Sequence, residues 1–204
     1  MNRVSFLLGA TLALGVGLGS AAPSRAAQAG HWRTTTYVRC TYAVGNYSVC
    51  TDLFGPIRAV GLRWTVLVRR SVRDYTVDRR GHYRVRATEI FFEKSPHGKA
   101  LRRCDAQSIT VQLFTGTCRY TRRERGRIVR GKRGMPVFRP VEATVTYRGR
   151  HPSRQHLGSS AAQRFGPPTP AAPGVYRTAR LLALMGHTKV PPGVTIRVAV
   201  KRSR

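Results

Sequence analysis

The chain has 204 residues, and its 37 lysines and arginines outnumber its 8 acidic residues so far that the formal net charge is +29 at pH 7. A GC-rich genome would explain a preference for arginine over lysine but not this scarcity of acids, so codon bias is excluded as the sole cause. The length allows one sizeable domain or two small ones, and the charge implies polyanionic surroundings or partners.

The N-terminus has the layout of a secretory signal peptide. Arg3 is followed by an apolar stretch at residues 4–19, and residues 27–29 read Ala-Gln-Ala, a small-x-small cleavage pattern. We therefore predict a signal peptide at residues 1–29 and a secreted, extracellular domain at residues 30–204. A retained membrane anchor is the alternative, because the apolar stretch approaches bilayer-spanning length. After cleavage, no transmembrane segment is expected.

Four cysteines lie in the predicted exported part, at Cys40, Cys50, Cys104 and Cys118. An even number in an oxidising compartment predicts two disulfides, for which three pairings are possible. Gly45 and Asn46 favour a hairpin that places Cys40 opposite Cys50, and Cys104–Cys118 then follows by exclusion. Because neither pair has the short CxxC spacing of a zinc site, we expect no metal.

Segments rich in β-branched and aromatic residues recur along the chain and are separated by glycine and proline. They lie at residues 34–42, 62–68, 82–92, 108–115, 141–147 and 194–200. In residues 83–87, apolar and cationic side chains alternate as in a half-buried strand. Residues 178–185 are compatible with either a helix or a buried strand. We predict an all-β fold, namely a disulfide-stabilised, immunoglobulin-like β-sandwich, with two small tandem β domains as the alternative.

A Gly-x-aromatic-Arg pattern occurs three times, at residues 30–33, 81–84 and 174–177. In the last two, the aromatic residues Tyr83 and Tyr176 directly follow turn-forming residues. Immunoglobulin-like sandwiches place a tyrosine at such a corner, where its hydroxyl ties down the connecting loop. We predict this structural role for both tyrosines. An aromatic ligand platform is the alternative.

Residues 118–134 combine eight cationic side chains with one acid, Glu124. We predict a basic hairpin that turns near Arg125 and Gly126, with its base held by the Cys104–Cys118 disulfide. Arginine forks suit phosphates, sulfates and carboxylates. The predicted polyanion-binding residues are Arg119, Arg122, Arg123, Arg125, Arg127, Arg130, Lys132 and Arg133. The alternatives are a solvated strand edge, or a binding face on the sheet itself at Arg84 and Arg86. Residues 148–174 are predicted to form a long Pro-rich loop.

The sequence offers no catalytic site that we can assign. It lacks the Gly-x-Ser-x-Gly elbow and a Gly-rich phosphate loop, and Glu89 and Glu93 lie too far apart on one strand face to act on one bond. Its six histidines are not clustered (His31, His82, His97, His151, His156 and His187). A secreted ribonuclease-like hydrolase that uses two of them is the best enzymatic alternative. We expect no cofactor.

These observations favour a secreted, non-enzymatic binding protein whose partner is a polyanion: a cell-wall polymer, nucleic acid or acidic polysaccharide. Sequence-specific DNA recognition is not expected, because no helix suited to a major groove is visible. An extracellular protein-binding or inhibitor module is the alternative. Salt dependence separates the two, because polyanion binding weakens steeply with salt.

Overall fold

The computed structural model describes residues 29–43, 45–55, 64–104, 113–148, 153–162 and 165–203. Apart from Ala29, the predicted signal peptide lies outside these residues. No helix in the described ranges is both long enough and apolar enough to cross a bilayer.

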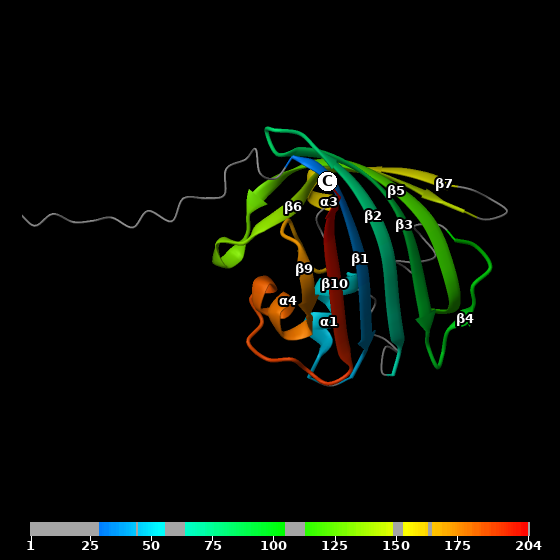
Figure 1. Cartoon of the computed structure of the whole chain (residues 1–204). Coiled ribbons are helices and arrows are strands. Elements are labelled where there is room, and N and C mark those ends of the chain that lie inside the picture. The colour runs from blue at the N-terminus through cyan, green and yellow to red at the C-terminus, as the bar shows by residue number, and fades with distance from the viewer. Residues whose placement is uncertain are drawn as a thin grey trace, which may run out of the picture.

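Long strands dominate the structure, and short helices pack beside them (Figure 1). The strands are β1 (Gly30–Thr41), β2 (Val66–Val77), β3 (His82–Lys94), β4 (Lys99–Ala100), β5 (Phe114–Arg130), β6 (Pro136–Tyr147), β7 (Ser153–Leu157), β8 (Thr169–Pro170), β9 (Gly174–Arg177) and β10 (Val194–Ser203). The helices are α1 (Tyr47–Phe54), α3 (Ser159–Ala162), α4 (Thr178–Met185) and the 3-10 turn Lys132–Gly134.

All the strands join in one open sheet with the order β7-β6-β5-β3-β2-β1-β10-β9, to which the short strands β4 and β8 add at β5 and β6. Every pairing is antiparallel except that of β4 with β5. The prediction of a mostly β protein is confirmed, but an immunoglobulin-like sandwich is not, because the described strands form no second sheet. The alternative of tandem domains gains no support either, since the first strand, β1, pairs with the last, β10.

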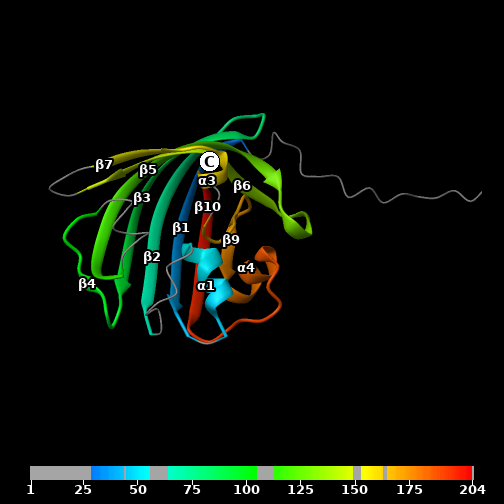
Figure 2. The same ribbon diagram turned by 180° about the vertical axis from the view of Figure 1, so that it is seen from behind.

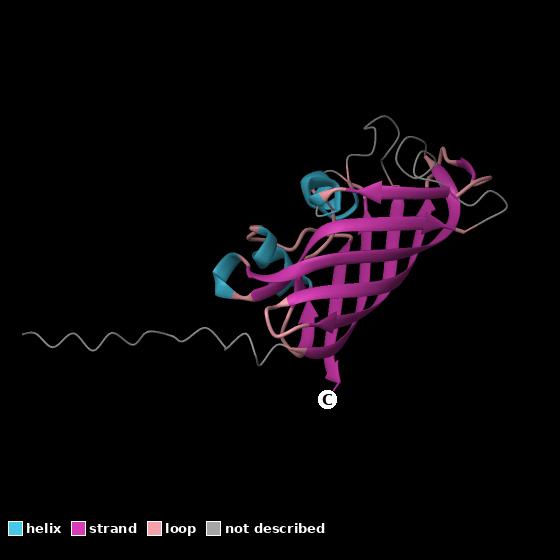
Figure 3. Cartoon of the chain, turned by 90° about the horizontal axis from the view of Figure 1, so that it is seen from above, coloured by secondary structure: helices cyan, strands magenta, loops and turns pink. Residues whose placement is uncertain are grey.

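The sheet curls so strongly that it covers much of its own inner face, and Figure 3 shows one group of strands passing across the others. The Phe138 ring of β6 stacks on Tyr75 of β2 at 4.1 Å and meets Trp32 of β1 at 5.9 Å between ring centroids. In the sheet order, β5, β3 and β2 lie between β6 and β1. Curvature of long strands therefore closes the core without a second sheet, which is the physical reason why the sandwich prediction was not confirmed.

Strand alternation divides the sheet into an inner face, which carries the core, and an outer face. In β3 the odd-numbered residues from Tyr83 to Glu93 are buried on the inner face, and the even-numbered residues between them lie on the outer face. Helices α1 and α4 pack against the inner face near β1 and β10 (Figure 2). Their residues Leu53, Leu181 and Leu182 are at most 1% exposed.

Both disulfides pair as predicted, Cys40 with Cys50 and Cys104 with Cys118, at Cα–Cα distances of 5.8 and 5.4 Å. The local geometry at Cys50 differs from the prediction, because this residue lies in α1 rather than in the second strand of a hairpin. Asn46 turns the chain into that helix: its side chain accepts the Ala43 N–H at 2.9 Å and donates to the carbonyl oxygens of Thr41 and Pro192.

The ambiguous segment at residues 178–185 forms α4, which ends at Gly186 in the left-handed conformation with φ 103°. Just before it, the Tyr176 hydroxyl donates to the Ala172 carbonyl at 2.9 Å and ties down the preceding loop, as the sequence predicts. Tyr83 does not serve a loop; its hydroxyl lies on the inner face and donates to Glu124 at 3.2 Å. Within residues 148–174 the structure contains β7, α3 and β8, so this segment is more regular than a Pro-rich loop.

Glu93 is a nearly fully buried acid on the inner face of β3, with 1% of its surface exposed. One carboxyl oxygen accepts the Phe114 N–H at 3.0 Å, and the other has no hydrogen-bond partner among the described residues. Burial raises the pKa of Glu93 to about 7, although the Phe114 N–H acts in the opposite direction. The folded state therefore favours the protonated acid.

We expect Glu93 to make stability fall as the pH rises. Because its pKa is higher in the folded than in the unfolded state, its stabilising contribution is complete below the unfolded pKa and is lost as the pH rises through about 7. The loss is on the order of 3 kcal/mol. The variant Glu93→Gln keeps an acceptor for Phe114 and does not titrate, so its advantage over the wild type should grow between acidic and mildly alkaline pH. Urea unfolding at several pH values measures this difference, and a difference that stays constant with pH would contradict it.

Candidate functional site

The basic segment at residues 118–134 does not turn where the sequence predicts. β5 runs straight through Arg125 and Gly126 to Arg130, and the chain reverses at residues 131–135 before β6 begins. At Arg125 and Gly126 the pairing with β6 shifts by one residue, which forms a bulge. Glycine is required there because a Cβ on Gly126 would overlap the Arg139 carbonyl oxygen and the Tyr83 hydroxyl. The glycine therefore marks a close approach between strands, not a turn.

Strand alternation divides the predicted polyanion-binding residues among three places. Arg119, Arg123, Arg125 and Arg127 are exposed on the outer face. Arg122 faces inward, where its Nε bonds Glu124 at 2.6 Å. Arg130, Lys132 and Arg133 are exposed at or near the hairpin tip, and Lys132 donates to the Met185 carbonyl at 3.0 Å. The predicted set is therefore not one surface.

The β3–β5 pairing brings the outward arginines of β5 together with those of β3. Arg84 lies opposite Arg125, and Arg86 lies opposite Arg123. We call the resulting surface the outer basic patch, and it consists of Arg84, Arg86, Arg119, Arg123, Arg125 and Arg127, all of them exposed. A shallow depression of about 520 Å³ lies over its centre. The structure thus joins the predicted β5 arginines with the alternative site at Arg84 and Arg86.

Two acids neutralise part of this charge, and both line the same depression. Glu142 binds Arg125 at 2.5 and 2.8 Å, and Asp74, which lies opposite Arg86 in the β2–β3 register, is 3.5 Å from Arg33. The other five arginines of the patch form no salt bridge with a described residue. Three of the seven described acids (the eight in the sequence less Asp105) are buried on the inner face: Glu89, Glu93 and Glu124. Burying those acids leaves the outer face strongly positive.

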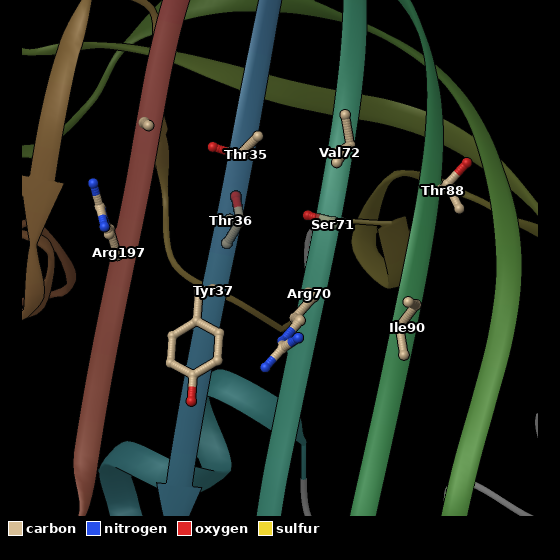
Figure 4. A pocket seen from close by; sticks show the side chains of 10 residues that line it. Thr35, Thr36, Tyr37, Arg70, Ser71, Val72, Thr88, Ile90 and Arg197 are labelled. Carbon is tan, nitrogen blue, oxygen red and sulfur yellow. The ribbon is translucent and has the colours of Figure 1, made fainter.

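A second depression, of about 490 Å³, lies beside the patch on the outer face (Figure 4). Tyr37 of β1 lies between Arg70 of β2 and Arg197 of β10, and the Arg70 guanidinium is 5.5 Å from the centre of the Tyr37 ring. Threonine and aliphatic side chains form the rest of its floor, among them Ile90, which pairs with Arg119. The outer face therefore offers a cationic surface that extends from β10 to β5.

The structure places the described histidines apart from one another. His82 pairs with Asp78 at 3.3 Å, and His187 pairs with Asp52 at 2.9 Å. His31 and His156 each contact a threonine hydroxyl at 3.4 Å, His97 is exposed, and His151 lies outside the described residues. Among the residues that the structure describes, no three His, Cys, Asp or Glu side chains are grouped so that they could hold a metal ion.

Comparisons with protein-family models, curated proteins and solved structures give no match to this chain.

We expect the crowding of arginines on the outer face to lower the stability of the fold. Arg123 lies opposite Arg86 and on the same strand face as Arg125, and like charges in such positions destabilise a sheet. Replacing Arg123 with Glu should therefore stabilise the fold by about 0.5 kcal/mol at low ionic strength.

Urea unfolding of Arg123→Glu and of the neutral control Arg123→Gln, at low and high salt, measures this gain. We expect the glutamate variant to exceed the glutamine variant at low salt, and the difference to shrink at high salt because of screening. Equal or lower stability of the glutamate variant at low salt would contradict the electrostatic interpretation.

Proposed function

We propose that this chain is a secreted, strongly basic, non-enzymatic binding protein that associates with polyanions through the outer basic patch. The observation that carries the proposal is the pairing of Arg86 with Arg123, neither of which forms a salt bridge with a described residue, beside the Arg84–Arg125 pair, in which Glu142 compensates Arg125. Such like-charged pairs lower the stability of the free protein. An anionic ligand that lies between them relieves the repulsion, so its binding gains free energy that a scattered set of cations would not provide.

The spacing of the patch suits a polymer with repeated anionic groups. Neighbouring strands lie about 5 Å apart, and residues on one face of a strand repeat about every 7 Å. The arginines of β3 and β5 therefore form a regular grid of forked donors, and Arg119 extends it toward Tyr37 and Arg70. A cell-wall polymer, nucleic acid or acidic polysaccharide presents phosphates, sulfates or carboxylates in series, which such a grid can bind at several points.

The same grid suits sequence-independent binding to a nucleic-acid backbone and not the recognition of individual bases. All six side chains project from a sheet surface, and guanidinium contacts to a nucleic-acid backbone fix position without selecting sequence. The alternative of an extracellular protein-binding or inhibitor module predicts a weaker dependence on salt, because an apolar interface is not screened.

The central prediction concerns the salt dependence of binding. In the variant with Arg86, Arg119, Arg123 and Arg127 replaced by Ser, duplex DNA used as a probe should bind more weakly. The plot of log K against log salt should become shallower by about 3.6, which is 0.9 for each of four lost contacts. Each exposed substitution should change stability by less than about 0.5 kcal/mol. Fluorescence anisotropy over a range of salt concentrations measures the slope.

A matched control removes four other exposed cations near β4, namely Lys94, Lys99, Arg102 and Arg103. If the outer basic patch is the site, this control should keep the wild-type slope. If the slope of log K against log salt becomes shallower by the same amount in both variants, binding depends on net charge alone and the proposed patch is wrong. Arg122 is left unchanged in both variants because its side chain supports the inner face through Glu124.

Export is a separate part of the proposal. We expect cleavage after Ala29, so that the mature protein begins at Gly30, the first residue of β1. A mature chain with that N-terminus retains every residue that pairs with β2 and β10. N-terminal sequencing of the protein from culture supernatant tests this, and recovery of an intact, membrane-bound chain that begins at Met1 would contradict it.

A further inference from the structure

A cavity of about 470 Å³ lies on the inner face of the sheet, opposite the outer basic patch. Its walls are the inner sides of β2, β3, β5 and β6, and it is covered by Phe54 of α1, Ala162 of α3 and residues 165–169. Pockets of this size and enclosure are typical of small-molecule sites. This cavity is too small for the polymer proposed above and lies on the other side of the sheet.

Two arginines and two glutamates form a paired network in and beside the cavity. Arg73 bonds Glu89 at 2.8 Å and lies 4.0 Å from Glu124. Arg122 bonds Glu124 at 2.6 Å and also donates to the Ala162 carbonyl at 2.7 Å. Burial alone would raise the pKa of Glu89, but Arg73, Arg122 and Arg69 together lower it to about 2. Glu89 is therefore ionised at neutral pH, and within each pair the charges of the arginine and the glutamate neutralise each other.

Four arginines line the cavity, namely Arg69, Arg73, Arg122 and Arg139, and Arg69 forms no salt bridge with a described residue. Its guanidinium lies 5.2 Å from the centre of the Phe54 ring, and its Nη1 lies next to Gly166 in the covering segment. Its Nε is buried without a hydrogen-bond partner in the described chain, and the buried Ser71 hydroxyl on the same strand face is also unpaired. Buried donors without partners are rare in folded proteins. Arg69 and Ser71 thus place two buried donors without partners on the inner face of β2, and the Nε of Arg73 on the same strand is a third.

Much of the remaining wall is apolar, although Thr36, Gln155 and Thr169 also line it. Its aromatic and aliphatic side chains come from α1, β3, β6, β7 and the covering segment, and they include Phe54, Phe91, Phe138, Val145, Leu157 and Phe165. Phe165 is 38% exposed, which places the opening of the cavity at the covering segment. A ligand in this site would therefore meet the Arg69 and Ser71 donors of β2 at one end and these apolar side chains at the other.

We infer that the inner cavity binds a small amphipathic monocarboxylate, whose carboxylate bonds Arg69 and Ser71 and whose hydrocarbon part lies against the apolar wall. One carboxylate has enough acceptor positions for the Arg69 and Ser71 donors, whereas the second charge of a dianion would lie against the apolar part of the wall, where burial of an ion is costly. An uncharged molecule would leave the Arg69 donor unpaired. This site is independent of polymer binding on the outer face.

The test uses decanoate as the probe, measured by isothermal titration calorimetry with the full mature protein. Decanoate should bind, and decanol should bind about 10- to 100-fold more weakly because it cannot form the charge-assisted bonds. The variant Arg69→Met retains the length of the side chain without its charge. The affinity of this variant for decanoate should fall by about the same factor, and its affinity for decanol should change little. The wild-type comparison of the two ligands tests the proposal even if this variant does not fold.

The matched control is Arg39→Met, which removes an exposed arginine of β1 that belongs to neither site. It should leave decanoate affinity unchanged, and so should saturating duplex DNA. The proposal is overturned if decanoate does not bind, if decanol binds as tightly, if Arg39→Met weakens decanoate as much as Arg69→Met, or if DNA displaces decanoate, which would place the carboxylate on the outer face.

Discussion

The pairing of β3 with β5 is the constraint on which both proposed sites depend. Its register runs from His82 opposite Arg127 to Lys94 opposite Thr115. On the outer face this register places arginine opposite arginine, and on the inner face it places Glu89 opposite Tyr120 and near Arg122. A slip of one residue would move every side chain of one strand to the other face. It would bring arginines into the core and expose the buried acids.

The distribution of acids explains how one sheet carries two different electrostatic surfaces. Glu89 and Glu124 neutralise Arg73 and Arg122 in the interior, where an unpaired charge would be costly. Acids used in this way cannot screen the outer face, so the excess of arginine appears there. Arginines of the outer basic patch other than Arg125 are therefore left without a salt bridge to a described acid.

Curvature of the sheet creates the interior space. Phe138 packs against Trp32 and Tyr75 because β6 bends over the inner face, and the segments that contain Phe54 and Phe165 cover the remaining opening. The covering segment is tied to α1 by the bond from the Gly166 N–H to the Asp52 carbonyl at 3.1 Å. A flat sheet with the same register would retain the outer basic patch but would have no enclosed cavity, so the two sites depend on different features of the same fold.

The sequence by itself determined the features that depend on near neighbours. Alternation in residues 83–87 showed a half-buried strand, the turn residues between Cys40 and Cys50 favoured the observed disulfide pairs, and the residues before Tyr176 indicated its role in holding a loop. It also identified the cations of β5, although not their orientation. A turn assumed at Gly126 hid the fact that continuous alternation directs Arg123 outward and Arg122 inward.

The tertiary structure decided everything that depends on which strands become neighbours. No local pattern places Arg86 opposite Arg123, since these residues are far apart in the chain and meet only through the β3–β5 register. Before the helix that contains Cys50, the Asn46 side chain likewise donates to the Pro192 carbonyl, a contact across most of the chain. Arg69 became distinctive only when the curved sheet paired Arg73 and Arg122 with buried acids and left Arg69 without a salt bridge to a described residue. Side-chain alternation follows from backbone geometry within one strand, whereas register and curvature come from packing over the whole sheet.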